Sequence, residues 1–157
     1  MKTTTDVELE VRYAETDQMG VVHHAAYLVW FEVARTRLCA DAGRPYDEIE
    51  RAGYFLVVSG VDVTYREGAR YGDVVRVTSW VDWVASRALQ FGYHVRRRGN
   101  GRPADSRRSD ALLAEGHTRH VWVDKASGRH CRMPADLVEA FLGLAEQDSL
   151  VRPARES

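Results

Sequence analysis

The chain has 157 residues, of which 45% are hydrophobic, so it can bury one substantial core and is too short for two domains of ordinary size. Its 22 basic and 23 acidic residues give a formal charge of −1, which excludes a global attraction to nucleic acid or to an anionic membrane. No apolar run reaches the roughly 18–20 residues of a membrane span, and no signal-peptide pattern follows Met1. We expect a single domain over residues 1–146, a polar C-terminal tail over residues 147–157, and a cytoplasmic location.

The first fifty residues change from the pattern of a strand to that of a helix. Apolar and charged side chains alternate from Val7 to Tyr13, which is the period-2 pattern of a half-buried strand. After a short loop, apolar side chains recur at the helical period, in a stripe so wide that we expect a sheet to wrap the helix. The stripe consists of Tyr27, Phe31, Ala34, Leu38 and Ala42, widened by Leu28 and Trp30. Gly43 is expected to cap the helix. Pro45 is expected to open a short second helix that stops before Gly53.

The next seventy residues have strand character. Four segments carry β-branched or aromatic residues at alternating positions, and turn signals such as Gly99-Asn100-Gly101 separate them. Because the links are short, these strands can pair as an antiparallel meander. The segments are Tyr54–Arg66, Asp73–Val84, Arg87–Arg98 and Asp110–Asp124, and a short helix opens at Pro134. This order predicts an α+β fold in which a five-stranded antiparallel sheet covers the long helix, and such a sheet favours association into dimers or tetramers.

A lone acid, Asp17, lies in the glycine-containing loop between the first strand and the long helix. Gly20 lets the backbone pass close to a ligand, and Val22 can wall a pocket. The helix begins near His24, and its first free N–H groups point towards the loop, where they can polarise a carbonyl as an oxyanion hole does. Asp17 can then act as nucleophile or as general base. The competing interpretation is a capping or turn residue.

The histidines do not have the spacing of a metal site. The side chains of the adjacent His23 and His24 should diverge, and no third ligand follows at the spacing of a zinc site. His117 and His120 are three apart on a predicted strand, so they should face opposite sides. We therefore expect no metal. The His24 imidazole keeps two interpretations, packing at the helix start or orienting the substrate and sharing a proton with Asp17.

Other nucleophiles also lack support. No Gly-x-Ser-x-Gly segment is present, and Cys39 falls inside the predicted helix. Cys39 and Cys131 form no C-x-x-C pair, so both are expected to be reduced thiols. Glu32 and Arg35 are one helical turn apart and are expected to form a structural salt bridge. Asp17 is the strongest remaining candidate.

The residues around Asp17 resemble a known family. Residues 17–24, Asp-Gln-Met-Gly-Val-Val-His-His, followed by Tyr27-Leu28 and Phe31-Glu32-x-x-Arg35, are similar to the signature of the 4-hydroxybenzoyl-CoA thioesterase branch of the hotdog-fold acyl-CoA thioesterases, which includes the Tol-Pal-associated thioesterase-like proteins. The likeness extends over residues 6–140 through Val11-Arg12-Tyr13-x-Glu15-Thr16, Tyr65-Arg66, Arg70-Tyr71-Gly72-Asp73, Glu115-Gly116 and Val121-x-Val123-Asp124.

The resemblance implies a hotdog fold, with an antiparallel sheet wrapped around a long helix and active sites at the interfaces of a homodimer or homotetramer. It implies hydrolysis of an acyl-CoA thioester to a carboxylic acid and free CoA. In such enzymes the acid at the position of Asp17 is the nucleophile or general base, and the backbone N–H at His24 polarises the thioester carbonyl. Gly20 and Val22 line the site. CoA is then part of the substrate, and no separate cofactor is implied.

The substrate contacts are less well defined. Tyr27 and Trp30 are candidates for the acyl pocket, with core packing as the alternative. Arginines that can meet the CoA phosphates are Arg66 and Arg87, with Arg70 as a competitor, and the dense cluster Arg96-Arg97-Arg98 with Arg102, Arg107 and Arg108, whose alternative role is a solvated loop. His23 stands where the family often has an aromatic residue, and Ala26 where it often has a small polar one, so the acyl preference stays open.

Two other functions are compatible with the same fold. One is a non-catalytic module that binds acyl-CoA or fatty-acyl ligands as a sensor, and the other is a hotdog dehydratase or hydratase that uses His24 with Asp17. The presence of Asp17 favours the enzyme over the sensor, and the absence of the longer hydratase motif favours hydrolysis. Balanced charge and the lack of a recognition motif argue against nucleic acid. CoA and acyl carrier protein remain alternative carriers of the acyl group.

Overall fold

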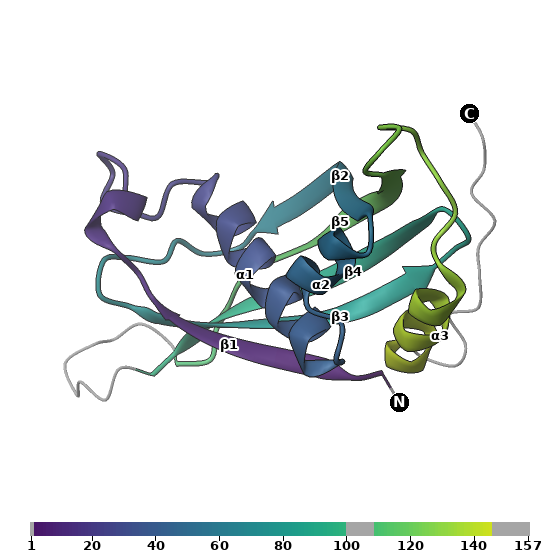
Figure 1. Cartoon of the computed structure of the whole chain (residues 1–157). Helices are drawn as coiled ribbons and strands as arrows, with labels where there is room; N and C mark the ends of the chain where they lie inside the picture. The colour runs from purple at the N-terminus through teal and green to yellow at the C-terminus, as the bar shows by residue number, and fades with distance from the viewer. Residues whose placement is uncertain (1, 100–108, 146–157) are drawn as a thin grey trace.

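The structure is a computed structural model that describes residues 2–99 and 109–145. Figure 1 shows a long, twisted sheet with α1 lying across one face, the loop before α1 at one end and α3 at the other. The elements in chain order are β1 (Thr4–Glu10), the short 3₁₀ helix η1 (Tyr13–Glu15), α1 (Ala26–Asp41), α2 (Tyr46–Arg51), β2 (Tyr54–Tyr65), β3 (Val74–Val84), β4 (Ala88–Arg98), β5 (Leu112–Asp124) and α3 (Ala135–Leu144).

The sheet has five antiparallel strands in the order β1-β3-β4-β5-β2, which confirms the predicted α+β architecture. The bounds of β2 to β5 lie within two residues of the predicted segments. The predicted meander is correct only for β3, β4 and β5. β2 does not pair with β3, because β1 and β4 occupy both sides of β3. It pairs instead with the free side of β5 and becomes an edge strand.

The first strand ends earlier than predicted, at Glu10 instead of Tyr13. The chain turns there because Arg12 donates its backbone N–H to the side chain of Glu15, 2.9 Å away, and residues 13–15 close into η1. Val11 is still buried, so the apolar pattern predicted its burial correctly although the strand ends before it. This turn sets the direction of the loop that carries Asp17.

The predicted apolar face of α1 is buried against the sheet. Tyr27, Phe31, Ala34 and Leu38 are each at most 2% exposed, and the ring of Phe31 stacks on that of Tyr93 with centroids 4.2 Å apart. Leu28 was expected to widen this face and does not, because it is 38% exposed. The outer face of α1 exposes Leu28 together with Val29 and Val33.

The far end of the sheet is closed by α3. The ring of Phe141 packs against Trp122 of β5 with centroids 6.2 Å apart, and Thr3 donates its backbone N–H to Leu144, which ties the N-terminus to α3. Gly43 and Gly53 end α1 and α2 in the left-handed region as predicted, with φ of 76° and 102°. In the described part of the chain, no helix has the length and apolar character needed to span a membrane. The predicted tail, 147–157, lies outside the described residues.

Candidate active site

Asp17 lies in a tight turn between η1 and α1. Its backbone N–H donates to Val21, its carbonyl accepts from Gly20, and its Oδ1 accepts the N–H of Met19 at 2.8 Å. Gly20 has φ of 78°, which a side chain would strain. The turn role considered from the sequence is therefore real. It uses only one carboxylate oxygen, since Oδ2 accepts no hydrogen bond from any residue that the structure describes.

The rest of the loop is fixed by backbone hydrogen bonds to two other segments. Val22 donates its N–H to Ala69 at 2.8 Å, and His23 donates to the carbonyl of Glu15 at 2.7 Å. Val21 packs against the backbone of Gly68 so closely that a Cβ added there would lie 2.8 Å from a Val21 methyl carbon. The position of the loop is set before any ligand arrives.

Glu15 joins this loop to α1, a role that the sequence did not predict. Its carboxylate is buried, with Oε1 accepting the backbone N–H of Arg12 and Oε2 accepting the indole Nε1–H of Trp30 at 2.7 Å. Burial alone would raise the pKa of Glu15, but the hydrogen bonds from Arg12 and Trp30 favour the charged form and hold the pKa below its usual value. The spacing of Glu15 and Trp30 follows no helical or strand period, so the sequence carries no signal for the contact.

The start of α1 leaves a backbone donor free. The helix begins at Ala26, with Ala25 as its N-cap and without a side-chain cap. Ala25 and Ala26 donate their N–H groups to the Nδ1 and carbonyl of His23, at 3.2 and 3.0 Å. The N–H of His24 has no acceptor among the described residues, while its carbonyl accepts the Tyr65 hydroxyl at 2.8 Å. The peptide is thus held in place with its donor available.

The two imidazoles stack instead of diverging. The rings of His23 and His24 have centroids 4.3 Å apart and planes 29° from parallel, so that prediction was wrong. The cause is the turn before the helix, where Nδ1 of His23 accepts the N–H of Ala25 and folds the ring back along the chain. Within residues 2–99 and 109–145, His24 makes no hydrogen bond to Asp17, and no three potential metal ligands gather.

The sequence-predicted substrate contacts are divided between the two ends of the molecule. Val22 and Tyr27 are 5% and 2% exposed and lie under the loop, with the Tyr27 ring against that of Tyr65 at 5.2 Å. Arg66 follows Tyr65 and pairs with Glu115 at 2.9 Å while staying about half exposed. Arg87 lies in the turn between β3 and β4, beyond Val84, and β3 begins beside the Asp17 end. Within one chain, Arg87 is therefore not brought to the site.

The arginine cluster on β4 serves the fold where it is described. Arg97 is 4% exposed and contacts Glu67 and Asp73, at 3.1 and 3.6 Å. Arg98 pairs with Glu8 on β1, and Arg96 donates to a backbone carbonyl. The remaining members, Arg102, Arg107 and Arg108, lie outside the described residues. Acids and a backbone carbonyl of the same chain therefore account for the described arginines of the cluster without a phosphate.

The largest pKa shifts belong to groups in the core. Arg35 donates to the Tyr46 hydroxyl at 3.1 Å and also bonds Tyr93, whose hydroxyl shares Thr118 with His120. These five residues form what we call the core polar network. Burial raises the pKa of Tyr93 to about 12 and lowers that of His120 to about 3.

Two sequence predictions concern residues beside this network. Glu32 lies 3.8 Å from Arg35, which confirms the predicted salt bridge. Cys39 is buried and free, and burial raises the pKa of its thiol to about 12. Such a thiol is protonated at neutral pH and is a poor nucleophile. His117 and His120 face opposite sides of β5 as predicted, because His117 is partly exposed beside Asp62 while His120 is fully buried.

Comparisons with known proteins identify relatives among the thioesterases. A family model described as the thioesterase-like superfamily matches residues 11–141. The chain is 38% identical over 120 residues to YneP of Bacillus subtilis, a putative acyl-CoA thioesterase, covering 76% of this chain and 80% of the relative. It is 25% identical over 133 residues to the acyl-CoA thioester hydrolase YbgC of Escherichia coli, covering 85% of this chain and 92% of the relative.

Solved structures give the same result. The hypothetical protein TT1821 from Thermus thermophilus is 41% identical with a TM-score of 0.78, over 90% of this chain and 98% of that chain. The DHNA-CoA thioesterase from Staphylococcus aureus is 27% identical with a TM-score of 0.79, over 90% of each chain. The five-stranded sheet around α1 is the hotdog fold of these proteins.

Proposed function

The chain belongs to the thioesterase-like superfamily, its relatives support hydrolysis of acyl-CoA thioesters, and we propose that Asp17 and the backbone N–H of His24 perform this reaction here. The observation that carries the assignment is that two polar groups of the same loop, Oδ2 of Asp17 and the N–H of His24, have no partner among the described residues. The other oxygen of Asp17 and the N–H groups of His23 and Ala25, on both sides of His24, are used by the turn and its anchors. A group that is held in place without a protein partner can bind a ligand.

The N–H of His24 is the donor for the thioester carbonyl oxygen. As the carbon becomes tetrahedral, negative charge develops on that oxygen, and a donor at a helix start stabilises it. The Tyr65 hydroxyl, 2.8 Å from the His24 carbonyl, keeps the peptide from rotating the donor away. The charge is therefore met by a group whose orientation is fixed in advance.

Asp17 can serve by two routes that use the same groups. As general base, it takes a proton from water while the water oxygen bonds to the acyl carbon, and the C–S bond then breaks as the CoA sulfur receives that proton. As nucleophile, its oxygen forms an acyl anhydride and releases CoA, and water then cleaves the anhydride to return the carboxylate and the free acid. Both routes end with the same products, so the test below addresses the carboxylate itself.

Asp17→Asn is the decisive variant. Asparagine keeps the acceptor for the Met19 N–H, so the turn should persist while the carboxylate is lost. We expect kcat for the best acyl-CoA in a thiol-release assay over an acyl-CoA panel to fall at least about 100-fold. Asp136→Asn, an exposed acid at the start of α3, is the matched control and should keep the wild-type rate. Wild-type turnover by Asp17→Asn would remove the assignment.

The proposal includes a second copy of the chain and a cytoplasmic location, where acyl-CoA esters are available. β2 is an unpaired edge of twelve residues that exposes Phe55, Val57, Val58 and Val61, and α1 exposes Leu28, Val29 and Val33 beside it. An exposed apolar edge strand favours antiparallel pairing with its own copy, as a dimer or within a tetramer. Sedimentation equilibrium tests this, and a monomer at assay concentration contradicts it.

A further inference from the structure

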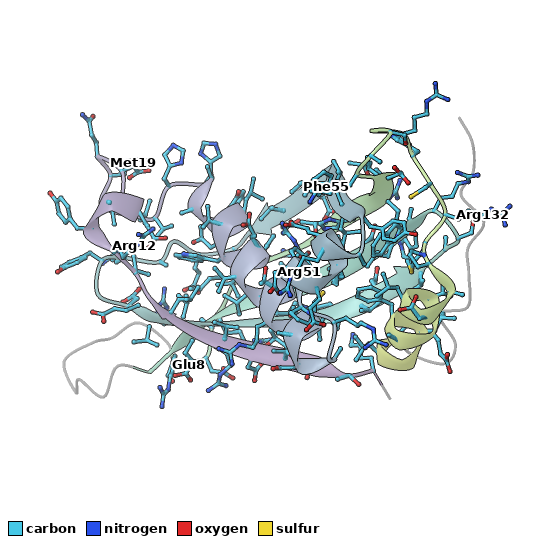
Figure 2. All side chains as sticks on the ribbon, viewed as in Figure 1. Glu8, Arg12, Met19, Arg51, Phe55 and Arg132 are labelled. Carbon is cyan, nitrogen blue, oxygen red and sulfur yellow. The ribbon has the colours of Figure 1, made fainter. Side chains whose placement is uncertain are left out.

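Two tyrosines stand exposed at the end of the molecule that carries Asp17. Tyr13 is 77% exposed and Tyr71 is 65% exposed, and their rings meet edge to face with centroids 5.7 Å apart. Met19, in the Asp17 loop, is 80% exposed at the same end (Figure 2). Large side chains gathered in this way on a surface are typical of a binding site.

The backbone holds Tyr71 in this position. Arg70 and Asp73 close a turn through two hydrogen bonds, and Gly72 between them has φ of 80°. The turn is then fixed to the end of β1, because Val11 donates to Asp73 at 2.8 Å and accepts from Gly72 at 3.2 Å. Tyr71 therefore projects from a rigid turn, and its exposure is not the result of a loose loop.

Tyr13 is connected to the candidate active site through the backbone. It opens η1, and its carbonyl accepts both the N–H and the hydroxyl of Thr16, at 3.1 and 2.7 Å. Thr16 directly precedes Asp17. The tyrosine pair and the catalytic carboxylate are thus parts of one hydrogen-bonded unit.

An arginine precedes each tyrosine in the chain. Arg12 is largely exposed, with its Nε 3.3 Å from Glu15, so the rest of its guanidinium faces solvent. Arg70 is exposed, and its guanidinium makes no ion pair with a residue in the described ranges. This differs from the β4 arginines, which are paired with acids or carbonyls. Aromatic faces next to free guanidinium groups match a stacked base and its phosphates.

We propose that Arg12, Tyr13, Arg70 and Tyr71, which we call the tyrosine patch, bind the nucleotide end of the CoA thioester. One tyrosine ring stacks on the adenine, and the two arginines pair with the phosphates. The proposal rests on the proposed function, because the pantetheine arm must lead from the patch to a carbonyl beside Asp17. It also commits to CoA as the carrier, since an acyl carrier protein presents the same arm without the adenosine.

Binding of free CoA, measured by calorimetry, tests the patch without any need for turnover. Tyr71→Ala should weaken Kd about tenfold, and Tyr71→Phe should restore most of the affinity, because the ring and not the hydroxyl does the stacking. Arg70→Gln should weaken binding and reduce its dependence on salt. Arg132→Gln, an exposed arginine at the opposite end (Figure 2), is the matched control. Thermal melts of each variant verify folding, which substitutions at exposed positions should preserve.

Kinetics then separate the patch from the chemistry. For Tyr71→Ala, the ratio of kcat/KM for an acyl-CoA to that for the matching acyl-pantetheine should fall about tenfold, because only the first substrate carries the nucleotide. Equal CoA affinity of wild type and Tyr71→Ala, or no CoA binding by the wild type, would overturn the proposal. Failure of the Asp17 assignment looks different, since it would appear as retained turnover in Asp17→Asn with CoA binding unaffected.

Discussion

The core polar network and the Asp17 loop both hold polar groups in fixed positions, but they use those groups differently. In the network, Arg35 bonds both Tyr46 and Tyr93 inside the core, and burial raises the pKa values of the two tyrosines strongly. In the loop, the backbone supplies most of the bonds, and one oxygen of Asp17 and one N–H of His24 are left over. In this fold a large pKa shift therefore marks burial, whereas the proposed site is marked by polar groups that have no partner among the described residues.

The arginines repeat this contrast on the surface. Arg97 is buried and contacts two acids, whereas Arg70 is exposed on a rigid turn beside an exposed tyrosine. The sequence alone did not rank Arg70 against the dense run of arginines as the phosphate site. Charge density along the chain does not reveal whether the neighbouring strands already provide carboxylates. Arg70, which has no ion-pair partner among the described residues, is therefore the better candidate for a phosphate contact.

The largest effect that separates the two regions should be on stability in acid, and it should come from His120. Its folded pKa of about 3 lies below the ordinary value of 6.5, so the unfolded chain binds more protons between these values. Stability is therefore full above pH 6.5 and falls as the pH drops towards 3. Between pH 7 and pH 5 the free energy of unfolding should decrease by about 2 kcal/mol through this group.

Urea denaturation at pH 7 and pH 5 measures this change. His120→Gln keeps a polar partner for Thr118 and removes the titration, so its own pH dependence over this range should be flatter by the same amount. His117→Gln, on the exposed face of β5, is the matched control. Equal slopes for wild type and His120→Gln would show that the network is not the acid-sensitive region.

A smaller effect, on both stability and rate, should come from Glu15, which links the two regions. Glu15→Gln replaces one acceptor oxygen by a donor, so either Arg12 or Trp30 loses its partner and unfolding should become easier by about 1–2 kcal/mol. Since the pKa of Glu15 is lowered in the fold, its contribution is present above its usual value of 4.5 and disappears as the pH falls below it.

The measurement pairs urea denaturation with thiol release for Glu15→Gln and for the exposed control Glu139→Gln. We expect the control to match the wild type in both assays. Glu15→Gln should lower kcat as well as stability, because Glu15 also accepts the N–H of His23 through its own backbone. A loss of stability with an unchanged kcat would mean that the loop keeps its geometry without this link.

The smallest effect should be that of Asp17→Asn on stability. The turn bond to Met19 survives in asparagine, so the free energy of unfolding at pH 7 should change by less than about 0.5 kcal/mol while catalysis is lost. A large destabilisation in the urea experiment would instead place Asp17 with the structural residues. The stability of this variant thus tests whether Asp17 supports the fold in the way that the residues of the core polar network do.

The sequence was sufficient for features that depend on local pattern. The period of the apolar residues located β2 to β5 and α1, and the glycines marked the ends of both helices. Strand order could not be read in the same way, because the pairing of β2 with β5 depends on which edge is free after β1 has paired. The place of Asp17 was predicted from its neighbours. One of the contacts that hold its loop, the hydrogen bond that Trp30 donates to Glu15, joins residues with no regular spacing.

The positions of His23, His24 and Arg87 are also features that sequence patterns could not predict. Backbone turns decide whether adjacent side chains separate, and the turn at Ala25 stacks His23 on His24. Arg87 was a reasonable phosphate ligand by type, but strand direction places it at the end away from Asp17. Residue type and spacing along the chain contain neither of these facts.

The hydrogen bond that Trp30 donates to Glu15 connects the Asp17 loop directly to the hydrophobic core. Trp30 is 3% exposed, and its indole N–H donates to the carboxylate that joins the loop to α1. A substitution at this buried position can consequently move the loop and change the activity of the enzyme. A mutant library restricted to exposed positions of the loop would omit Trp30 and this way of changing the position of the loop.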